Sequence, residues 1–191
     1  MTSDSHTSKK PKIPLIIDCA LTIIRDHGDQ GLTMRKVAAE AGISLGNLQY
    51  YFKNKNDLLK GMVDFYFQKC GAIFDEYVSA SQTTEPRRQI HDFISFSMGM
   101  TGCMSDIRKL FREFWAIAAR NEEINAHLKA YYKEYAEKFS TVLSPLTVHP
   151  EAVPKVVSLL IPYFEGYSVT SSAIPLNGEQ TKRMLTDIVM S

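Results

Sequence analysis

The sequence predicts an all-α protein of about nine helices, in which an N-terminal three-helix unit is joined to a larger helical bundle. Apolar residues recur at helical spacing along almost the whole chain, and no alternating pattern typical of a β-strand stands out. Gly, Pro, Asn and Ser separate these segments into loops of ordinary length. The composition agrees, because 45% hydrophobic and 23% charged residues in a chain of 191 are typical of a globular protein.

The beginning of the chain predicts a flexible tail and two helices. Residues 1–12 are polar, lack periodicity and contain the basic run KKPK, so we expect a mobile basic tail. The first helix begins near Pro14, and Gly28 and Gly31 stop it. The second follows Thr33, a suitable N-cap, and stops at Gly42.

Two further helices follow at once. Ser44 is a suitable N-cap for a short helix that reaches about Phe52. Either Asn54 or Asn56 then caps a long helix over residues 57–80. Beyond this helix, apolar stripes predict five more helices, within residues 90–101, 107–115, 124–142, 153–164 and 184–188.

Charge and cysteine content exclude several classes of protein. The net charge is +1, yet residues 1–60 carry nine Lys/Arg against six Asp/Glu, whereas residues 61–191 carry thirteen against fifteen. Cys19, Cys70 and Cys103 are far apart, which argues against a disulfide framework or a zinc knuckle and favours a reducing compartment. The longest strongly apolar stretch is too short to span a bilayer. We therefore expect a cytoplasmic protein without a metal, a cofactor or a membrane partner.

Residues 33–52 are the most specific feature of the sequence, because two short helices joined by a tight turn with a glycine form a helix-turn-helix. The amides of Asn47 and Gln49 match the edge of adenine, while tyrosines and lysines suit phosphates. Gly46 costs about 1 kcal/mol within a helix, which is understandable where something large approaches the backbone. The alternative is a generic surface helix followed by a solvated turn. In this segment and just beyond it, the candidate DNA-binding residues are Thr33, Arg35, Lys36, Ser44, Leu45, Gly46, Asn47, Gln49, Tyr50, Tyr51, Lys53 and Lys55.

Two other motif matches do not support enzymatic or metal chemistry. The segment GISLG at residues 42–46 satisfies the G-x-S-x-G pattern of hydrolases, but that pattern requires a preceding strand and here a helix precedes it. Ser44 is therefore interpreted as an N-cap. Glu123 and His127 share a helix face, but no further His or Cys lies nearby in the sequence to complete a metal site.

The sequence resembles the TetR family of one-component transcriptional regulators. The resemblance rests on residues 32–38 (LTMRKVA), 41–48 (AGISLGNL) and 50–59 (YYFKNKNDLL), and continues weakly in 111–116 (FREFWA) and 164–167 (FEGY). It implies an all-α homodimer with a DNA-binding region at residues 13–56 and a ligand-binding and dimerisation region at residues 57–191.

The resemblance also implies roles for individual residues. Thr33 and Arg35 would start the helix that braces the DNA backbone, and Arg35 would reach a base. The residues placed in the major groove would be Leu45, Gly46, Asn47, Gln49 and Tyr51. Lys55 would meet a phosphate. The family usually has Tyr where this chain has Gln49, so the bases read at that position would differ.

The second region is rich in aromatic residues, which would serve either as core or as the lining of a ligand cavity with a few polar groups. With the resemblance in view, the candidate pocket residues are His91, Phe93, Met98, Phe111, Glu113, Phe114, Trp115, Tyr132, Tyr163 and Tyr167. The late helices carry apolar residues beyond one stripe, which predicts a dimer interface with Leu159, Tyr163, Gly166, Val169, Met184 and Ile188.

The function expected from these observations is that of a ligand-responsive repressor. It would bind a near-palindromic DNA operator as a homodimer and would be released by a small, largely apolar effector. An effector-independent DNA-binding regulator is one alternative. An all-α enzyme using the aromatic cavity is another, although the sequence offers no paired carboxylates, nucleophile–base pair or cofactor loop.

Overall fold

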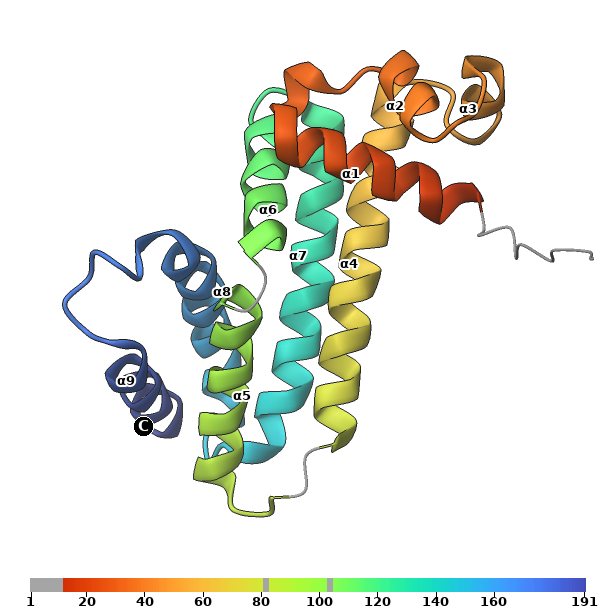
Figure 1. Ribbon diagram of the computed structural model, residues 1–191. Coiled ribbons are helices and arrows are strands. Elements are labelled where there is room, and N and C mark those ends of the chain that lie inside the picture. Colours follow the sequence, from red (N-terminus) through yellow and green to blue (C-terminus); the bar gives the residue numbers. More distant parts are fainter. Residues whose placement is uncertain (1–11, 81–82, 103–104) are drawn as a thin grey trace, which may run out of the picture. The chain divides into compact units, whose positions relative to one another are not determined.

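The computed structural model describes residues 12–80, 83–102 and 105–191, with side chains for all of these except residues 100–109. The expected basic tail, apart from Lys12, and Cys103 lie outside the described residues. Every regular element in the described ranges is a helix, which confirms the all-α fold (Figure 1). The α-helices are α1 (Lys12–Gly31), α2 (Met34–Glu40), α3 (Leu45–Tyr51), α4 (Lys55–Ala80), α5 (Pro86–Gly102), α6 (Ser105–Ala118), α7 (Glu122–Leu143), α8 (Val153–Thr170) and α9 (Gly178–Met190). Two short 3-10 helices, η1 (Ser144–Leu146) and η2 (Pro150–Ala152), connect α7 to α8.

The chain packs into two compact units. The first comprises Met1–Cys70 and Leu110–Leu128, and the second comprises Gly71–Lys109 and Lys129–Ser191. Helices α4, α6 and α7 each contribute residues to both units. These two units are defined by how the helices pack. The predicted boundary between residues 56 and 57 instead separates a DNA-binding region from a ligand-binding and dimerisation region, and it stays a prediction.

In the first unit, α1 is amphipathic and buries one side through Ile16, Ile17, Ala20, Ile23 and Ile24. The regular helix is interrupted at Gly28, whose φ of 65° lies in the left-handed region that favours glycine. Of the two predicted stops, Gly28 interrupts the helix and Gly31 is its last residue.

Long helix α4 begins at Lys55, slightly earlier than predicted. Its start is capped by Asn54, whose side-chain oxygen accepts a hydrogen bond from the backbone N–H of Asp57 at 2.9 Å. Of the two asparagines that the sequence left open, Asn54 is thus the cap.

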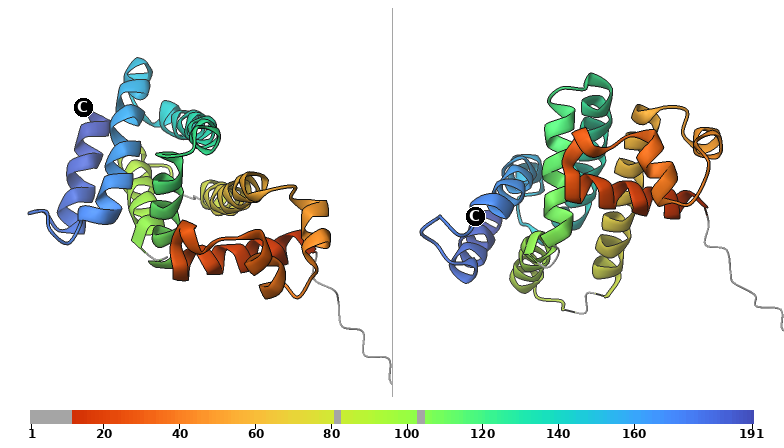
Figure 2. Two further views of the ribbon diagram at one scale, coloured as in Figure 1. Left: turned by 90° about the horizontal axis from the view of Figure 1, so that it is seen from above. Right: turned by 45° about the horizontal axis from the view of Figure 1, so that its top comes forward.

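The core of the second unit is built around aromatic rings. Phe93 of α5 and Phe139 of α7 are fully buried, with ring centroids 4.7 Å apart in an edge-to-face arrangement. Phe74 of α4 stacks on Phe139 at 5.7 Å. Helices α5, α8 and α9 pack against one another (Figure 2). Burying each of these rings stabilises the unit by roughly 1.5–3 kcal/mol.

Helix α9, the last in the chain, has a complete capping box. The side chain of Asn177 accepts the backbone N–H of Gln180 at 2.9 Å, and the side chain of Gln180 accepts the backbone N–H of Asn177 at 3.1 Å. This reciprocal pair satisfies two N–H groups that a helix start otherwise leaves unpaired, and so fixes where α9 begins.

Candidate functional site

The turn between α2 and α3 is a Schellman motif. The N–H of Ile43 donates to the carbonyl of Ala38 at 2.9 Å, and the N–H of Gly42 donates to the carbonyl of Ala39 at 3.1 Å. Gly42 has a φ of 64°, in the left-handed region that favours glycine. The predicted end of α2 at this glycine is confirmed.

Both short helices have the N-caps predicted from the sequence. The side-chain oxygen of Thr33 accepts the backbone N–H of Lys36 at 3.2 Å. The side-chain oxygen of Ser44 accepts the backbone N–H of Asn47 at 3.2 Å. Ser44 therefore serves as a helix cap, in agreement with the rejection of the hydrolase pattern.

Buried apolar residues hold α3 in place. Leu48 is fully buried, and Phe52, the C-cap of α3, is also buried. A Cβ placed on Gly61 of α4 would lie only 2.6 Å from Cε1 of Phe52. The glycine thus lets the ring at the end of α3 lie directly against α4.

The opposite side of α3 is open to solvent and carries the predicted contact residues. Gly46 and Gln49 are exposed, and Tyr50 has 82% of its surface accessible. Leu45, Asn47 and Tyr51 are partly buried. A Cβ added to Gly46 would meet nothing within 4 Å, so this glycine serves no packing need inside the chain.

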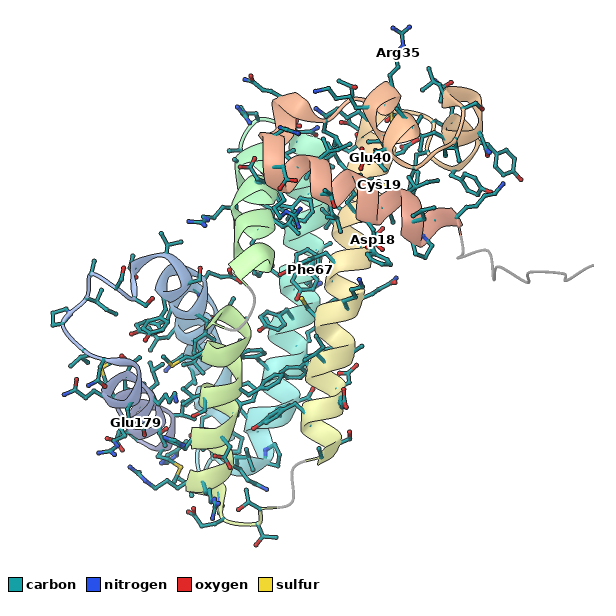
Figure 3. All side chains as sticks on the ribbon, viewed as in Figure 1. Asp18, Cys19, Arg35, Glu40, Phe67 and Glu179 are labelled. Carbon is teal, nitrogen blue, oxygen red and sulfur yellow. The ribbon has the colours of Figure 1, made fainter. Side chains whose placement is uncertain are left out.

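The start of α2 adds exposed polar and basic groups to the same region of the sequence. Thr33, Arg35 and Lys36 are all exposed, and Figure 3 shows Arg35 extending away from the helix. Lys53, just after α3, is exposed as well. These side chains have the chemistry that contacts phosphates and base edges.

Lys55 differs from the other lysines because the first unit already engages it. Its ammonium group lies 2.7 Å from the Oδ1 atom of Asp29 and donates a hydrogen bond to the carbonyl oxygen of Asp29 at 2.9 Å. The sequence gives no signal for this partner. The pair ties the start of α4 to the end of α1 and gives Lys55 a structural role besides the phosphate contact expected for it.

A polar network joins α4 and α7 within the first unit. Asn56 donates to Oε2 of Glu123 at 3.0 Å and accepts from Asn121 at 2.9 Å, while Lys60 forms an ion pair with Glu123. The hydrogen bond from Lys60 is the main reason that the pKa of Glu123 is lowered. Glu123, singled out with His127 as a possible metal face, is therefore part of an ion-pair network.

His127 also has a partner on α4. One of its ring nitrogens lies 2.6 Å from Oδ1 of Asp64. Among the described residues, no group of three or more His, Cys, Asp and Glu side chains is arranged to hold a metal ion.

The ten predicted pocket residues are divided between the two units. Phe111, Glu113, Phe114 and Trp115 belong to the first unit, where Tyr66 contacts the rings of Phe111 and Phe114 at 5.2 and 6.1 Å between centroids. Trp115 has 47% of its surface exposed, although helical spacing placed it on the apolar face of its helix.

The other six pocket residues lie in the second unit. Phe93 and Met98 are buried in its core, and Tyr132, Tyr163 and Tyr167 pack against that core. His91 is partly buried, and its Nε2 atom lies 3.6 Å from a carboxylate oxygen of Glu179.

A partly buried acid that carries little signal in the sequence lies in the second unit. Glu165 of α8 is partly buried, and its Oε1 atom accepts a hydrogen bond from the hydroxyl of Tyr132 at 3.0 Å. Burial raises the pKa of Glu165 to about 7, and the hydrogen bond from Tyr132 opposes the shift. The only sequence signal was its place in the segment FEGY.

The predicted dimer residues have mixed exposure. Leu159, Gly166 and Val169 lie at helical spacing on α8 and are exposed, as is Ile188 of α9. The remaining two, Tyr163 and Met184, are partly buried and pack against the core of their own unit.

Comparison with known proteins agrees with this geometry. The family model described as "Bacterial regulatory proteins, tetR family" matches residues 16–62. A protein of Xanthobacter autotrophicus, described as an uncharacterized HTH-type transcriptional regulator in the dhlA 5' region, is 40% identical over 187 residues, which cover 98% of this chain and 93% of that protein.

Solved structures share the fold at lower identity. Salmonella enterica GusR superposes with a TM-score of 0.75 at 15% identity, with 96% of each chain covered. A putative transcriptional regulator from Saccharomonospora viridis in complex with choline superposes with a TM-score of 0.72 at 13% identity, covering 93% of this chain and 94% of that chain.

The capped helix-turn-helix, with its exposed α3 face, defines a DNA-binding transcriptional regulator. The chain belongs to the TetR family of bacterial regulatory proteins, which are transcriptional regulators and not enzymes. None of the described helices is both long enough and apolar enough to pass through a membrane.

Proposed function

We propose that this protein is a homodimeric repressor that leaves its operator when a small effector binds. Residues 13–56 bind DNA, and residues 57–191 bind the effector and form the dimer. The exposed face of α3, which includes Gln49 and the open space at Gly46, is the observation that carries the proposal. In a twofold dimer the two α3 helices enter successive major grooves about 34–36 Å apart.

Helix α4 is the element through which an effector acts. It starts at Lys55, shortly after α3 ends, and continues without interruption to Ala80. A shift of this helix alters the spacing of the two α3 helices. A tenfold loss of operator affinity needs about 1.4 kcal/mol of coupling, and operator DNA weakens effector binding by the same factor.

The aromatic second unit supports an effector of organic character. Tyr132, Tyr163 and Tyr167 are partly buried amphipathic rings beside its core. The related fold from Saccharomonospora viridis was solved in complex with choline, which supports a small-molecule effector.

The experiment that tests DNA recognition compares two glycines. The operator is first selected from random duplex DNA, and affinity is then measured by fluorescence anisotropy. Gly46→Ala keeps the fold, because an added Cβ meets nothing within 4 Å, but it places a methyl group between α3 and the groove. Gly99→Ala on α5 is the matched control, since it is equally open.

Both variants should gain about 0.5–1 kcal/mol of stability from the loss of a helical glycine. Only Gly46→Ala should lose operator affinity, by tenfold or more. Equal affinity in the two variants would contradict the placement of α3 in the groove.

Effector action is tested by titrating compounds with and without operator DNA while following the fluorescence of Trp115, the only tryptophan. An effector should bind more weakly when operator is present. If every compound that binds does so equally in both titrations, the protein is an effector-independent regulator and the switch is wrong.

A further inference from the structure

Two polar pairs join α4 to α7 in the first unit and share one register. Lys60 forms an ion pair with Glu123, and a ring nitrogen of His127 lies 2.6 Å from Oδ1 of Asp64. The partners of each pair are 63 residues apart in the chain, so the two helices run in the same direction here. Asn56 adds a hydrogen bond to Oε2 of Glu123 at 3.0 Å. We call these five side chains the α4–α7 ladder.

Apolar packing beside the ladder does not by itself select this register. Leu59, Val63 and Phe67 of α4 are buried and recur every four residues. If α4 moved by one turn, about 5.4 Å, toward its N-terminus, Val63 and Phe67 would take the places of Leu59 and Val63. Burial of apolar surface is non-directional, so it discriminates weakly between these two arrangements.

The charges of the ladder do discriminate between registers. The same displacement would bring Asp64 opposite Glu123, and two carboxylates repel each other. A displacement by one turn in the other direction would place Lys60 opposite His127, which offers no carboxylate. An exposed ion pair contributes little to overall stability. The ladder therefore acts by excluding the wrong registers of α4, because its polar partners match only in the observed one.

The ladder lies next to the contact that holds α3. Gly61 directly follows Lys60, and a Cβ placed on Gly61 would lie only 2.6 Å from the ring of Phe52, the C-cap of α3. Since a helix moves as a rigid element, the register at Lys60 determines where the surface at Gly61 lies. The ring of Phe52, and with it the end of α3, rests on that surface.

We propose that Glu123 is a positioning residue for operator recognition. Through Lys60 and Asn56 it holds α4 in the register that gives α3 the orientation required by the major groove. This inference rests on the proposed function and extends it, because Glu123 lies outside residues 13–56 and acts on DNA binding through α4, without a DNA contact of its own.

The test reverses one charge and then restores the pair. Glu123→Lys breaks the ladder, and the double variant Lys60→Glu/Glu123→Lys rebuilds the ion pair with its ends exchanged. Asp75→Lys is the matched control, because Asp75 of α4 pairs with Lys138 of α7 at 2.8 Å, in the second unit and again 63 residues apart. Glu123 and Asp75 are both exposed, so either variant should fold, which thermal melts verify.

Two readouts separate positioning from a general structural effect. The first is the ratio of operator affinity to affinity for random duplex DNA, measured by fluorescence anisotropy at one salt concentration. The ratio removes the effect of added positive charge, which strengthens binding to both DNAs. The second is the rate of backbone amide hydrogen exchange in residues 45–52, followed by mass spectrometry without DNA.

Glu123→Lys should lower the affinity ratio at least tenfold and speed exchange in residues 45–52 at least fivefold. The double variant should return both values to within threefold of wild type, and Asp75→Lys should stay within twofold. Glu123→Gln, a milder change, should shift both readouts in the same direction by at least twofold.

The proposal is overturned if Glu123→Lys leaves either readout at the wild-type value, if Asp75→Lys has the same effect, or if the double variant does not recover. These results are separable from the proposed function. A wild-type protein that selects no operator from random DNA refutes the proposed function, whereas the exchange rates of residues 45–52 still decide whether Glu123 holds α3.

Discussion

Replacing Glu165 by Gln should change how the stability of the protein depends on pH. The pKa of this carboxyl is about 7 in the folded protein against 4.5 for an ordinary glutamate. Between these two values the folded state binds more protons at this position than the unfolded state does, so wild-type stability falls as pH rises. Below pH 4.5 both states are protonated and the effect vanishes.

The magnitude follows from the two pKa values. Each pKa unit of difference between the folded and unfolded states corresponds to about 1.36 kcal/mol in free energy of unfolding. Integrated from pH 5 to pH 8, the difference in proton binding between the two states amounts to about 2.5 kcal/mol. The amide introduced by Glu165→Gln does not titrate and still accepts the hydroxyl of Tyr132. Relative to wild type, the variant should therefore gain about 2.5 kcal/mol in free energy of unfolding between these two pH values.

Urea denaturation of both proteins at pH 5, 6, 7 and 8, at one protein concentration, measures this difference. The contributions of all other titrating groups are common to both proteins and cancel in the comparison. A constant difference across the pH range would show that Glu165 ionises in the folded protein as it does in the unfolded chain. The reasoning about its burial would then be wrong.

Four other substitutions test the DNA-binding unit and the dimer. Lys53→Ala should make the slope of log affinity against log salt concentration shallower by about one, and a slope equal to that of wild type would contradict the phosphate contact. Lys55→Ala should lower the thermal midpoint of unfolding, because it removes the contacts with Asp29. DNA titrations at several salt concentrations and thermal melts distinguish the two effects. Gly61→Ala should destabilise the protein and weaken operator binding, because the added methyl group displaces the ring of Phe52 at the end of α3. A thermal melt equal to that of wild type would mean that the ring moves aside without cost. Leu159→Lys should convert the dimer into monomers, because it puts a charge on an exposed apolar stripe of α8. Sedimentation at micromolar concentration measures this change, and a variant that stays dimeric would place the interface elsewhere.

The sequence alone was sufficient for the fold class and for the helix-turn-helix. The caps at Thr33 and Ser44 and the turn at Gly42 depend on hydrogen bonds between residues three to five apart, so the residue types at these positions carry the information. The same holds for the buried stripes, because helical spacing determines which residues share a face.

The sequence could not predict which side chains far apart in the chain become partners. The ammonium of Lys55 suits a phosphate and a carboxylate equally, and only folding brings Asp29, 26 residues away, within reach of it. Trp115 belongs to an apolar stripe, yet about half of its surface is exposed, since periodicity does not say how wide the buried face of a helix is.

Glu165 is the clearest case of a residue whose character only the tertiary structure decided. In the sequence it is one glutamate among many, and nothing in its neighbours signals a shifted pKa. Packing of α7 against α8 brings in the hydroxyl of Tyr132 from 33 residues away and removes water from the carboxyl group. Local sequence determines hydrogen bonds within a helix turn, whereas desolvation and long-range pairing depend on which helices meet, and that is a property of the folded chain.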